Sequence, residues 1–210
     1  MLELRLLSVN VGQPRVIGER NGAPLLSAIA KEPVSANRIA VRALGLDGDA
    51  QANLRVHGGV DKAVYAYPAD HWGWWEEKRL ACGPARFGEN LTLEGAGETE
   101  LQIGDRFAWG DVVLEVSQPR SPCNKLERYT GRPDVGALMT VSGRCGWYLR
   151  VLAEGEAPTR NAVLTRIATG SGPHLRDVFH AAFDRRLAPE LRRSIAATPA
   201  LSDAWRARLV

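Results

Sequence analysis

The stretch IGDRFAWGDVVLEVSQPRSPCNKL, residues 103–126, contains two strand patterns followed by a proline-bracketed turn. Arg106 to Trp109 and Val112 to Ser117 are short apolar-rich runs bounded by turn residues, which is typical of β-strands. Similar runs recur on both sides of this stretch. The further predicted strands are Leu2 to Val11, Val34 to Ala43, Ala63 to Tyr67, Asn90 to Leu93, Tyr148 to Ala153 and Asn161 to Ile167. Repeated strands with few intervening helices predict a mainly β fold, a closed or nearly closed β-barrel over residues 1–168.

Helical patterns are confined to one interruption of the strands and to the end of the chain. One helix is expected to begin near Pro68, with Trp72, Trp75 and Leu80 roughly on one side. After about residue 170, apolar residues at three-four spacing predict three short helices. We therefore predict a small three-helix domain, residues 169–210, that docks on the barrel or on a partner because it is too small to be stable alone. Its expected helix-start signals are first-turn prolines at Pro173, Pro189 and Pro199 and an N-cap at Thr198.

The composition of the 210 residues is that of an ordinary globular protein. With 27 Lys and Arg against 24 Asp and Glu, the net charge of +3 argues against a nucleic-acid binder, although Arg38 and Arg42 make one strand face basic. No apolar run of about eighteen residues and no signal-peptide pattern occurs, so we expect a cytoplasmic protein without a membrane span. Three cysteines without a CxxC pair argue against a disulfide scaffold or a structural zinc site. Cys82 and Cys145 are interpreted as small buried residues.

Cys123 has the most unusual setting of the three cysteines. Pro119 and Pro122 bracket it and disfavour a helix, which predicts a stiff turn after the preceding strand. Arg120 and Lys125 stand three residues before it and two after. Nearby cations favour the thiolate, which is the form that attacks electrophiles or binds soft metals. Because a buried structural cysteine is rarely found in such a basic turn, we predict that Cys123 is the reactive centre.

A glycine-rich block, GLDGDAQANLRVHGGVDKA, spans residues 45–63. Its acidic spacing resembles a calcium loop, but the twelfth position counted from Asp47 is a glycine instead of the expected glutamate. The Gly-Gly pair can turn backbone N–H groups toward an anion, and Arg55, His57 and Lys62 add side-chain donors. The block is therefore either a pocket for a phosphate or similar oxyanion, or a plain hairpin turn with a solvated rim.

Two further segments place polar residues on predicted strands. Glu89 and Asn90 follow a glycine at the start of one strand, where they can reach a barrel mouth. Arg150 lies on another strand with Tyr148 on the same face. An arginine in such a position is more often a solvated charge than a ligand-binding residue.

Taken together and in order, four blocks resemble the MOSC domain, the molybdenum-cofactor sulfurase C-terminal fold, and most closely its bacterial YiiM-type branch. The blocks are GLDGDAQAN…HGGVDKAVYAYP, FGENL, the stretch 103–126 quoted above, and GWYLRVLAEGEA. The resemblance covers about residues 1–165, and the helical tail matches the small extension of that branch. Lys31 lies where relatives also have a lysine, but Ser27-Ala28-Ile29 replaces their Thr-Gly-Ile-like turn.

The resemblance implies a barrel that holds a pyranopterin molybdenum cofactor, with Cys123 as both catalytic residue and protein ligand to the metal. Pyridoxal phosphate is not expected. By the same analogy, the residues that contact the cofactor are Arg55, His57, Lys62, Asn90, Arg120, Asn124, Lys125 and Arg150.

The implied activity is reduction of N-hydroxylated compounds, such as hydroxylaminopurines, to amines, which would detoxify base analogues. Electrons must come from elsewhere because no flavin, dinucleotide or iron–sulfur motif is found, so a separate flavoprotein is the implied partner of a monomer or homodimer. A non-catalytic module that carries the cofactor or a sulfur atom is the alternative. A nucleic-acid-binding barrel is disfavoured by the balanced charge.

Overall fold

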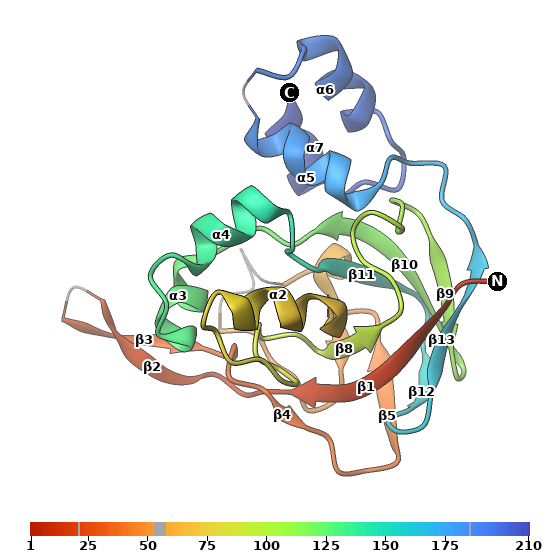
Figure 1. The fold of residues 1–210 in the computed structure, drawn as a ribbon. Coiled ribbons are helices and arrows are strands. Elements are labelled where there is room, and N and C mark those ends of the chain that lie inside the picture. The colour runs from red at the N-terminus through yellow and green to blue at the C-terminus, as the bar shows by residue number, and fades with distance from the viewer. Residues whose placement is uncertain (21, 53–57, 185) are drawn as a thin grey trace.

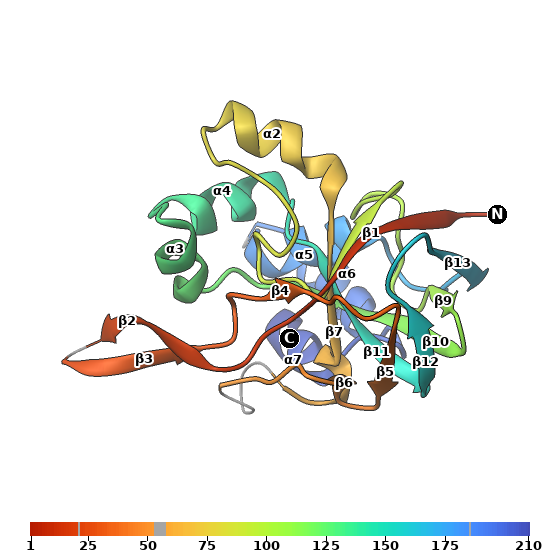
Figure 2. The same ribbon diagram turned by 90° about the horizontal axis from the view of Figure 1, so that it is seen from below.

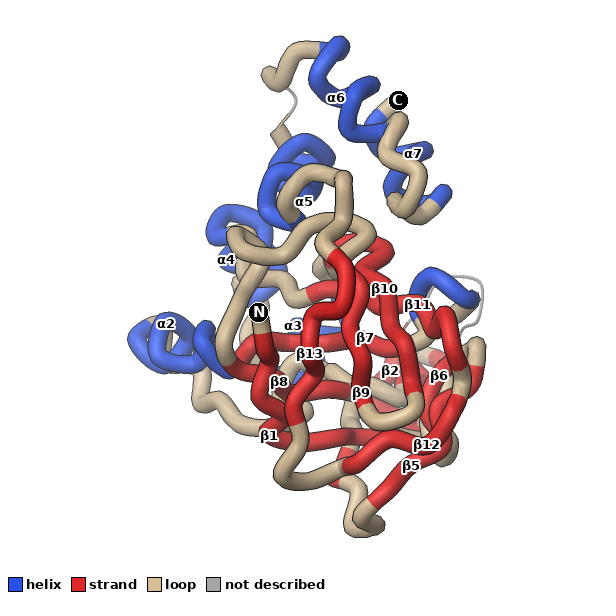
Figure 3. Tube along the Cα trace, turned by 90° about the vertical axis from the view of Figure 1, so that its right-hand side faces the viewer, coloured by secondary structure: helices blue, strands red, loops and turns tan. Residues whose placement is uncertain are grey.

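Seven strands close a β-barrel in the part of the chain that the computed structural model describes, residues 1–20, 22–52, 58–184 and 186–210 (Figure 1). Hydrogen bonding around the barrel runs from β13 through β9, β10, β11, β7, β8 and β1 and back to β13. The predicted β-barrel is thus confirmed (Figure 3). The strands are β1 (Glu3–Val11), β7 (Val64–Pro68), β8 (Leu91–Glu94), β9 (Arg106–Trp109), β10 (Val112–Pro119), β11 (Trp147–Ala153) and β13 (Val163–Ala168).

Period-two alternation produces the barrel wall. In β1, Leu4 and Leu6 are buried, whereas Arg5 between them is exposed and its Nε donates to Glu94 on β8. In β7 every residue is buried, because the barrel interior covers one face and helices and loops cover the other. Large side chains such as Phe107, Trp109 and Trp147 fill the core, as expected for a small barrel.

The connection from β7 to β8 contains the predicted interrupting helix. These two strands are parallel neighbours, and the chain between them forms η2 (Ala69–His71) and α2 (Trp72–Glu77). Trp75 is fully buried and its indole Nε1 donates to the Tyr67 hydroxyl at 2.5 Å. The helix is shorter than predicted, and Leu80 is buried after its end.

Several short strands on the barrel were not predicted. They are β2 (Arg15–Arg20) paired with β3 (Ala23–Ser27), β4 (Glu32–Pro33), β6 (Gly45–Leu46) and β12 (Gly155–Pro158). The last two form a small sheet with β5 (Arg38–Arg42), which lies within the strand predicted over Val34 to Ala43. The β2–β3 pair projects from the barrel as an arm (Figure 2). Its apolar residues Val16 and Leu26 are largely exposed, so no buried face produces the period-two signal.

Two helices after Cys123 were also missed. They are α3 (Asn124–Thr130) and α4 (Val135–Ser142), and they lie beside the barrel near α2 (Figure 1). The expectation that the prolines disfavour a helix holds only as far as Pro122, because α3 begins two residues later. Both helices end at glycines in the left-handed conformation, Gly131 and Gly143, with φ of 71° and 70°.

The three predicted C-terminal helices are present as α5 (Leu175–Phe183), α6 (Pro189–Ala196) and α7 (Asp203–Leu209), stacked above the barrel (Figure 1). Pro189 occupies the first turn of α6 as predicted, whereas Pro173 and Pro199 lie before their helices. The N-cap of α7 is Ser202 and not Thr198, since the Ser202 hydroxyl accepts the Trp205 N–H at 3.3 Å. The division into two domains at residue 168 stays a prediction. None of the helices in the described ranges has the length and hydrophobicity needed to cross a membrane.

Candidate functional site

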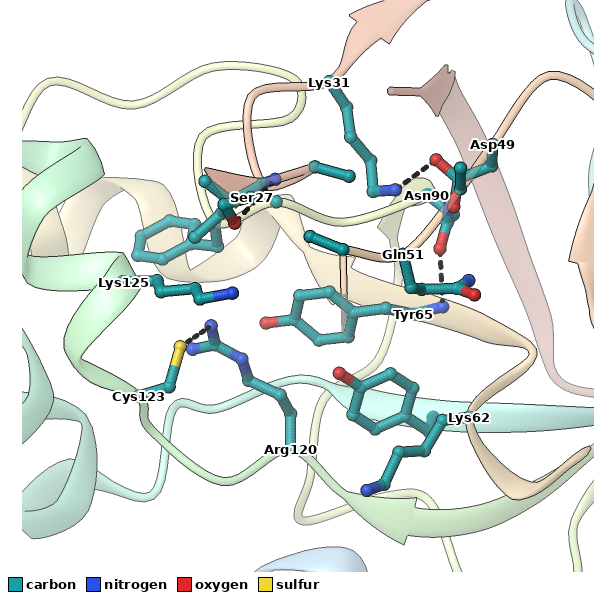
Figure 4. Close-up of a pocket in the computed structure, with 17 residues that line it drawn as sticks. Ser27, Lys31, Asp49, Gln51, Lys62, Tyr65, Asn90, Arg120, Cys123 and Lys125 are labelled. Carbon is teal, nitrogen blue, oxygen red and sulfur yellow. Dashed lines mark hydrogen bonds and ion pairs between the residues drawn. The ribbon is translucent and has the colours of Figure 1, made fainter. Parts of the chain in front are cut away.

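A cleft of about 600 Å³, including its open mouth, lies where β7, β10 and β11 meet the loops after β3 and β6 and before β8. The polar side chains that line it come from segments far apart in the chain and are shown in Figure 4. They are Ser27, Lys31, Asp49, Gln51, Lys62, Tyr65, Asn90, Arg120, Cys123, Lys125 and Tyr148.

Cys123 is at one end of this cleft. Its backbone is extended, with φ −138° and ψ 153°, and it is the residue from which α3 begins. The side chain is partly exposed, and Arg120 Nη2 lies 3.7 Å from its Sγ (Figure 4). The predicted cation does lie beside the thiol, whereas residues 121–123 form an extended segment that leads into α3 and not the predicted turn.

Arg120 is held from several sides. Its guanidinium stacks over the Tyr65 ring at 5.3 Å and its Nη1 contacts Met139 Sδ at 3.4 Å, while its backbone N–H donates to Gly146 O at 3.0 Å. At Gly146, with φ of 68°, an added Cβ would stand 2.4 Å from a β7 carbonyl oxygen. Glycine is required there for the close approach of β11 to β7. Arg120 is only 5% exposed and remains a cation, since its guanidinium is always protonated.

The opposite end of the cleft contains a buried ion pair. Lys31 Nζ bonds to Asp49 Oδ1, and Asp49 also accepts Asn90 Nδ2 at 2.9 Å and Gly12 N–H at 2.8 Å. Asn90 in turn accepts the Tyr65 N–H at 3.0 Å through Oδ1. Burial lowers the pKa of Lys31, and the charge of Asp49 opposes that shift. This network fixes the cleft wall.

Glu89 lies behind that wall and does not line the cleft. The carboxylate is fully buried, with Oε2 accepting the Phe87 N–H and Oε1 accepting the Thr92 hydroxyl, both at 2.9 Å. Burial raises the pKa of this carboxyl to about 7. Preceding it, Gly88 has φ of 78°, and a Cβ there would meet Ile29 at 2.6 Å.

The remaining lining residues add positive charge and hydroxyl groups. Lys125 Nζ donates to Leu26 O at 3.0 Å, and burial lowers the pKa of Lys62. Burial also raises the pKa of Tyr65 and of Tyr148, so both phenols stay protonated at neutral pH. The Tyr65 hydroxyl donates to Cys145 O at 2.9 Å, whereas the Tyr148 hydroxyl can donate a hydrogen bond into the cleft. Among the described lining residues, four cationic side chains thus face one carboxylate, Asp49.

The structure brings together five of the nine predicted site residues: Lys62, Asn90, Arg120, Cys123 and Lys125. Arg55 and His57 lie outside the described residues. Asn124 is exposed at the first position of α3 and is not part of the cleft wall. Whether any of these side chains contacts a cofactor stays a prediction.

Arg150 has a different environment from the one expected. Its guanidinium pairs with Asp61 and with Glu115, at 2.7 and 2.9 Å, and donates to Ala200 O at 2.9 Å. These contacts tie β11 to β10, to η1 (Val60–Lys62) and to the segment before α7. We therefore withdraw its assignment as a cofactor contact.

Six polar lining residues were not assigned from the sequence. Ser27, Tyr65 and Tyr148 lie in strands, and Lys31, Asp49 and Gln51 lie in loops, so no local motif marks them. Of the two other cysteines, Cys145 is buried as interpreted, whereas Cys82 is only partly buried. Burial raises the pKa of Cys82 to about 12 and raises that of Cys145 well above its ordinary value, so both remain unreactive thiols.

The donor set of the cleft fits a pyranopterin molybdenum cofactor. One accessible thiol suits a soft metal, and the cations suit a phosphate group. The amide of Gln51 lines the same space and suits a polar heterocycle. No cluster of three His, Cys, Asp or Glu side chains that could hold a bare metal ion occurs within the described ranges.

The fold and the cleft define a β-barrel protein with a single thiol set among cations, a class suited to an anionic cofactor that carries a soft metal. A sequence profile of the MOSC domain matches residues 53–170. The chain belongs to the MOSC domain family, in its YiiM-type branch.

Two sequence relatives and one solved structure illustrate this membership. The chain is 43% identical to Protein YiiM of Escherichia coli (strain K12) over 62% of this chain and 59% of that protein. It is 34% identical to a protein named Reductase from Gibberella moniliformis over 71% of this chain, which spans 27% of that longer protein. The crystal structure of YiiM from Geobacillus stearothermophilus superposes with a TM-score of 0.81 at 32% identity, covering 99% of this chain and 100% of that one.

Proposed function

We propose that this protein is a molybdenum-cofactor-dependent reductase that converts N-hydroxylated compounds, such as hydroxylaminopurines, to amines. The observation that carries the proposal is the placement of the Cys123 thiol at one end of a cleft with four cationic side chains. The family membership and the relative named Reductase support a redox activity for such a cleft.

Each part of the cleft has a distinct task in this proposal. Cys123 would hold the metal, and the guanidinium of Arg120, 3.7 Å from its Sγ, would place a positive charge beside it. Lys62 and Lys125 would bind the anionic part of the cofactor. Tyr148, which stays protonated, would donate a hydrogen bond to a polar atom of the ligand.

The overall reaction is R–NHOH + 2 e⁻ + 2 H⁺ → R–NH₂ + H₂O. The bound molybdenum centre supplies the two-electron chemistry at the N–O bond, which protein side chains alone cannot perform. We propose that the electrons come from a separate flavoprotein. Protons can enter as water through the open mouth of the cleft.

The test compares the wild type with Cys123→Ala, both produced in a host that makes the cofactor. Molybdenum content is measured in the purified proteins, and reduction of 6-N-hydroxylaminopurine is followed with a chemical electron donor. We expect stoichiometric metal and turnover in the wild type, and loss of both in Cys123→Ala. Cys82→Ala is the matched control and should retain both, because burial keeps that thiol unreactive.

The measurements also separate the alternative function. Cofactor binding without turnover of any N-hydroxylated substrate, given a competent electron source, would identify a carrier module. Full activity in metal-free protein would exclude the proposed mechanism.

A further inference from the structure

The last helix, α7, reaches the loop that carries Cys123. Arg208 Nη1 donates to Ser121 Oγ at 2.6 Å, across 87 residues of sequence. Ser121 lies one residue after Arg120 and two before Cys123. We call residues 120–123 the cysteine loop. The C-terminal helices therefore contact the candidate site directly at this loop.

An exposed arginine is usually too mobile to hold a loop, but Arg208 is restrained. Its guanidinium stacks over the rings of Phe183 and Trp205, at 5.2 and 5.5 Å. Trp205 is itself only 3% exposed. Because the guanidinium is stacked on two aromatic rings, the Arg208 side chain loses less conformational entropy when it forms a hydrogen bond.

Helix α7 is fixed relative to the strands that line the cleft. The Ser202 N–H donates to Ser117 O on β10 at 3.1 Å, three residues before Arg120. Arg150 on β11 donates to Ala200 O just before the helix. The start of α7 is thus bonded to β10 and β11, and Arg208 near its end is bonded to the cysteine loop.

Arg208 also lies close enough to the cleft to influence it electrostatically. Burial is the main cause of the lowered pKa of Lys62, and the charge of Arg208 adds to that shift. Lys62 lines the cleft. Arg208 is therefore near a residue of the cleft wall, although it does not itself line the cleft.

We propose that Arg208 is a positioning residue: through Ser121 it holds the cysteine loop so that the Cys123 thiol keeps its direction into the cleft. The inference rests on the proposed function only where it names Cys123 as the metal ligand. The C-terminal helices are then part of the site as well as a cover for the barrel.

The test measures the alkylation rate of Cys123 by iodoacetamide in metal-free protein, read by mass spectrometry of the Cys123 peptide. Ser121→Ala removes the contact but keeps the charge of Arg208, and Arg208→Ala removes both. Each variant is expected to react about fivefold faster, the factor that one hydrogen bond implies. The double variant should react no faster than either single one, because both changes break the same contact. Arg208→Lys should restore part of the protection.

Two controls keep the result specific. Arg193→Ala removes an exposed arginine of α6 that pairs with Glu190, and it should leave the rate unchanged. The Cys82 peptide in every sample reports general loosening of the fold. If Arg208→Ala lowers the melting temperature strongly, Ser121→Ala decides the question alone.

Unchanged alkylation in Ser121→Ala, or multiplicative effects in the double variant, would overturn the positioning role. Because the measurement uses metal-free protein, it gives the same answer whether or not molybdenum is found in the loaded protein. Failure of the positioning role and failure of the proposed function are therefore separate results.

Discussion

The two ends of the cleft differ in how their positive charge is balanced. At one end, Lys31 is paired with Asp49, which Asn90 and a backbone N–H also hold. At the other end, Arg120 and Lys125 lie beside Cys123, and no carboxylate is present there among the described lining residues. At the first end, the charges are neutralised within the protein. The second keeps unneutralised charge, which a protein retains at the expense of stability where an anionic ligand binds.

The largest effect is expected from breaking the balanced end. Lys31→Met would leave Asp49 buried without its cation, which should lower the free energy of unfolding by about 3–5 kcal/mol. Urea unfolding of the metal-free protein measures this change. Lys31→Met combined with Asp49→Asn should recover most of the loss. A loss below about 1 kcal/mol would show that the pair is solvated and that the two ends do not differ.

The buried carboxyl of Glu89, behind the balanced end, should make the free energy of unfolding depend on pH. Burial raises its pKa from 4.5 to about 7, so its carboxyl is protonated in both states at low pH. Between those two values the unfolded chain ionises first, and stability falls as pH rises, by up to about 3 kcal/mol; above pH 7 the penalty stays constant. Glu89→Gln should remove this fall. The free energies of unfolding of the two proteins, measured at pH 5, 6, 7 and 8, should converge at low pH. If the two proteins showed parallel pH profiles, the prediction would be wrong.

At the unbalanced end, removing the charge of Arg120 should have the opposite effect on stability. Because it is buried without a carboxylate partner among the described lining residues, Arg120→Met should stabilise the metal-free protein by about 1–2 kcal/mol. The same variant should lose bound molybdenum when it is produced in a cofactor-competent host. Calorimetry and metal analysis of one preparation check both effects. A destabilised variant would mean that the charge is compensated within the protein.

The smallest effect is expected at Lys125. Phosphate should raise the melting temperature of the metal-free wild type, and Lys125→Met should weaken the apparent phosphate affinity by about fivefold. Arg128→Ala, an exposed arginine on the same helix, is the matched control. Equal weakening in both variants would indicate a general effect of net charge and no specific contact.

The parts of the fold that could be predicted are those with a local periodic signal. Strand β1 alternates buried and exposed residues, as Leu4, Arg5 and Leu6 do, so its position follows from period two. Strand β7 is buried throughout and was found as a short apolar run bounded by turn residues. The β2–β3 arm has no buried face and could not be recognised in this way. Helix α3 was missed because the prolines around Cys123 were taken to disfavour helix over a longer stretch than they do. Helix α4 has only eight residues, which is shorter than the window over which helical periodicity can be recognised.

In the candidate site too, the residues that could be predicted are those that lie within one local motif. Cys123, Arg120 and Lys125 were found because they lie within one short motif. The pairing of Lys31 with Asp49 depends on two turns that only the fold brings together, so no sequence pattern reveals it. Arg150 was misassigned for the converse reason: its partners Asp61 and Glu115 come from other elements, and sequence alone presents it as an unpaired cation.

The number of strands in the barrel has a topological consequence for the cleft. In a ring of strands, alternation of direction can return to its starting point only if the number of antiparallel pairs is even. Seven strands therefore require an odd number of parallel pairs, and among the described strands β7 and β8 supply it. Parallel neighbours cannot be joined by a tight hairpin and need a long crossover. That crossover, residues 69–90, carries Phe87, Gly88 and Asn90 to the cleft, so the odd parity of the ring provides one of its walls.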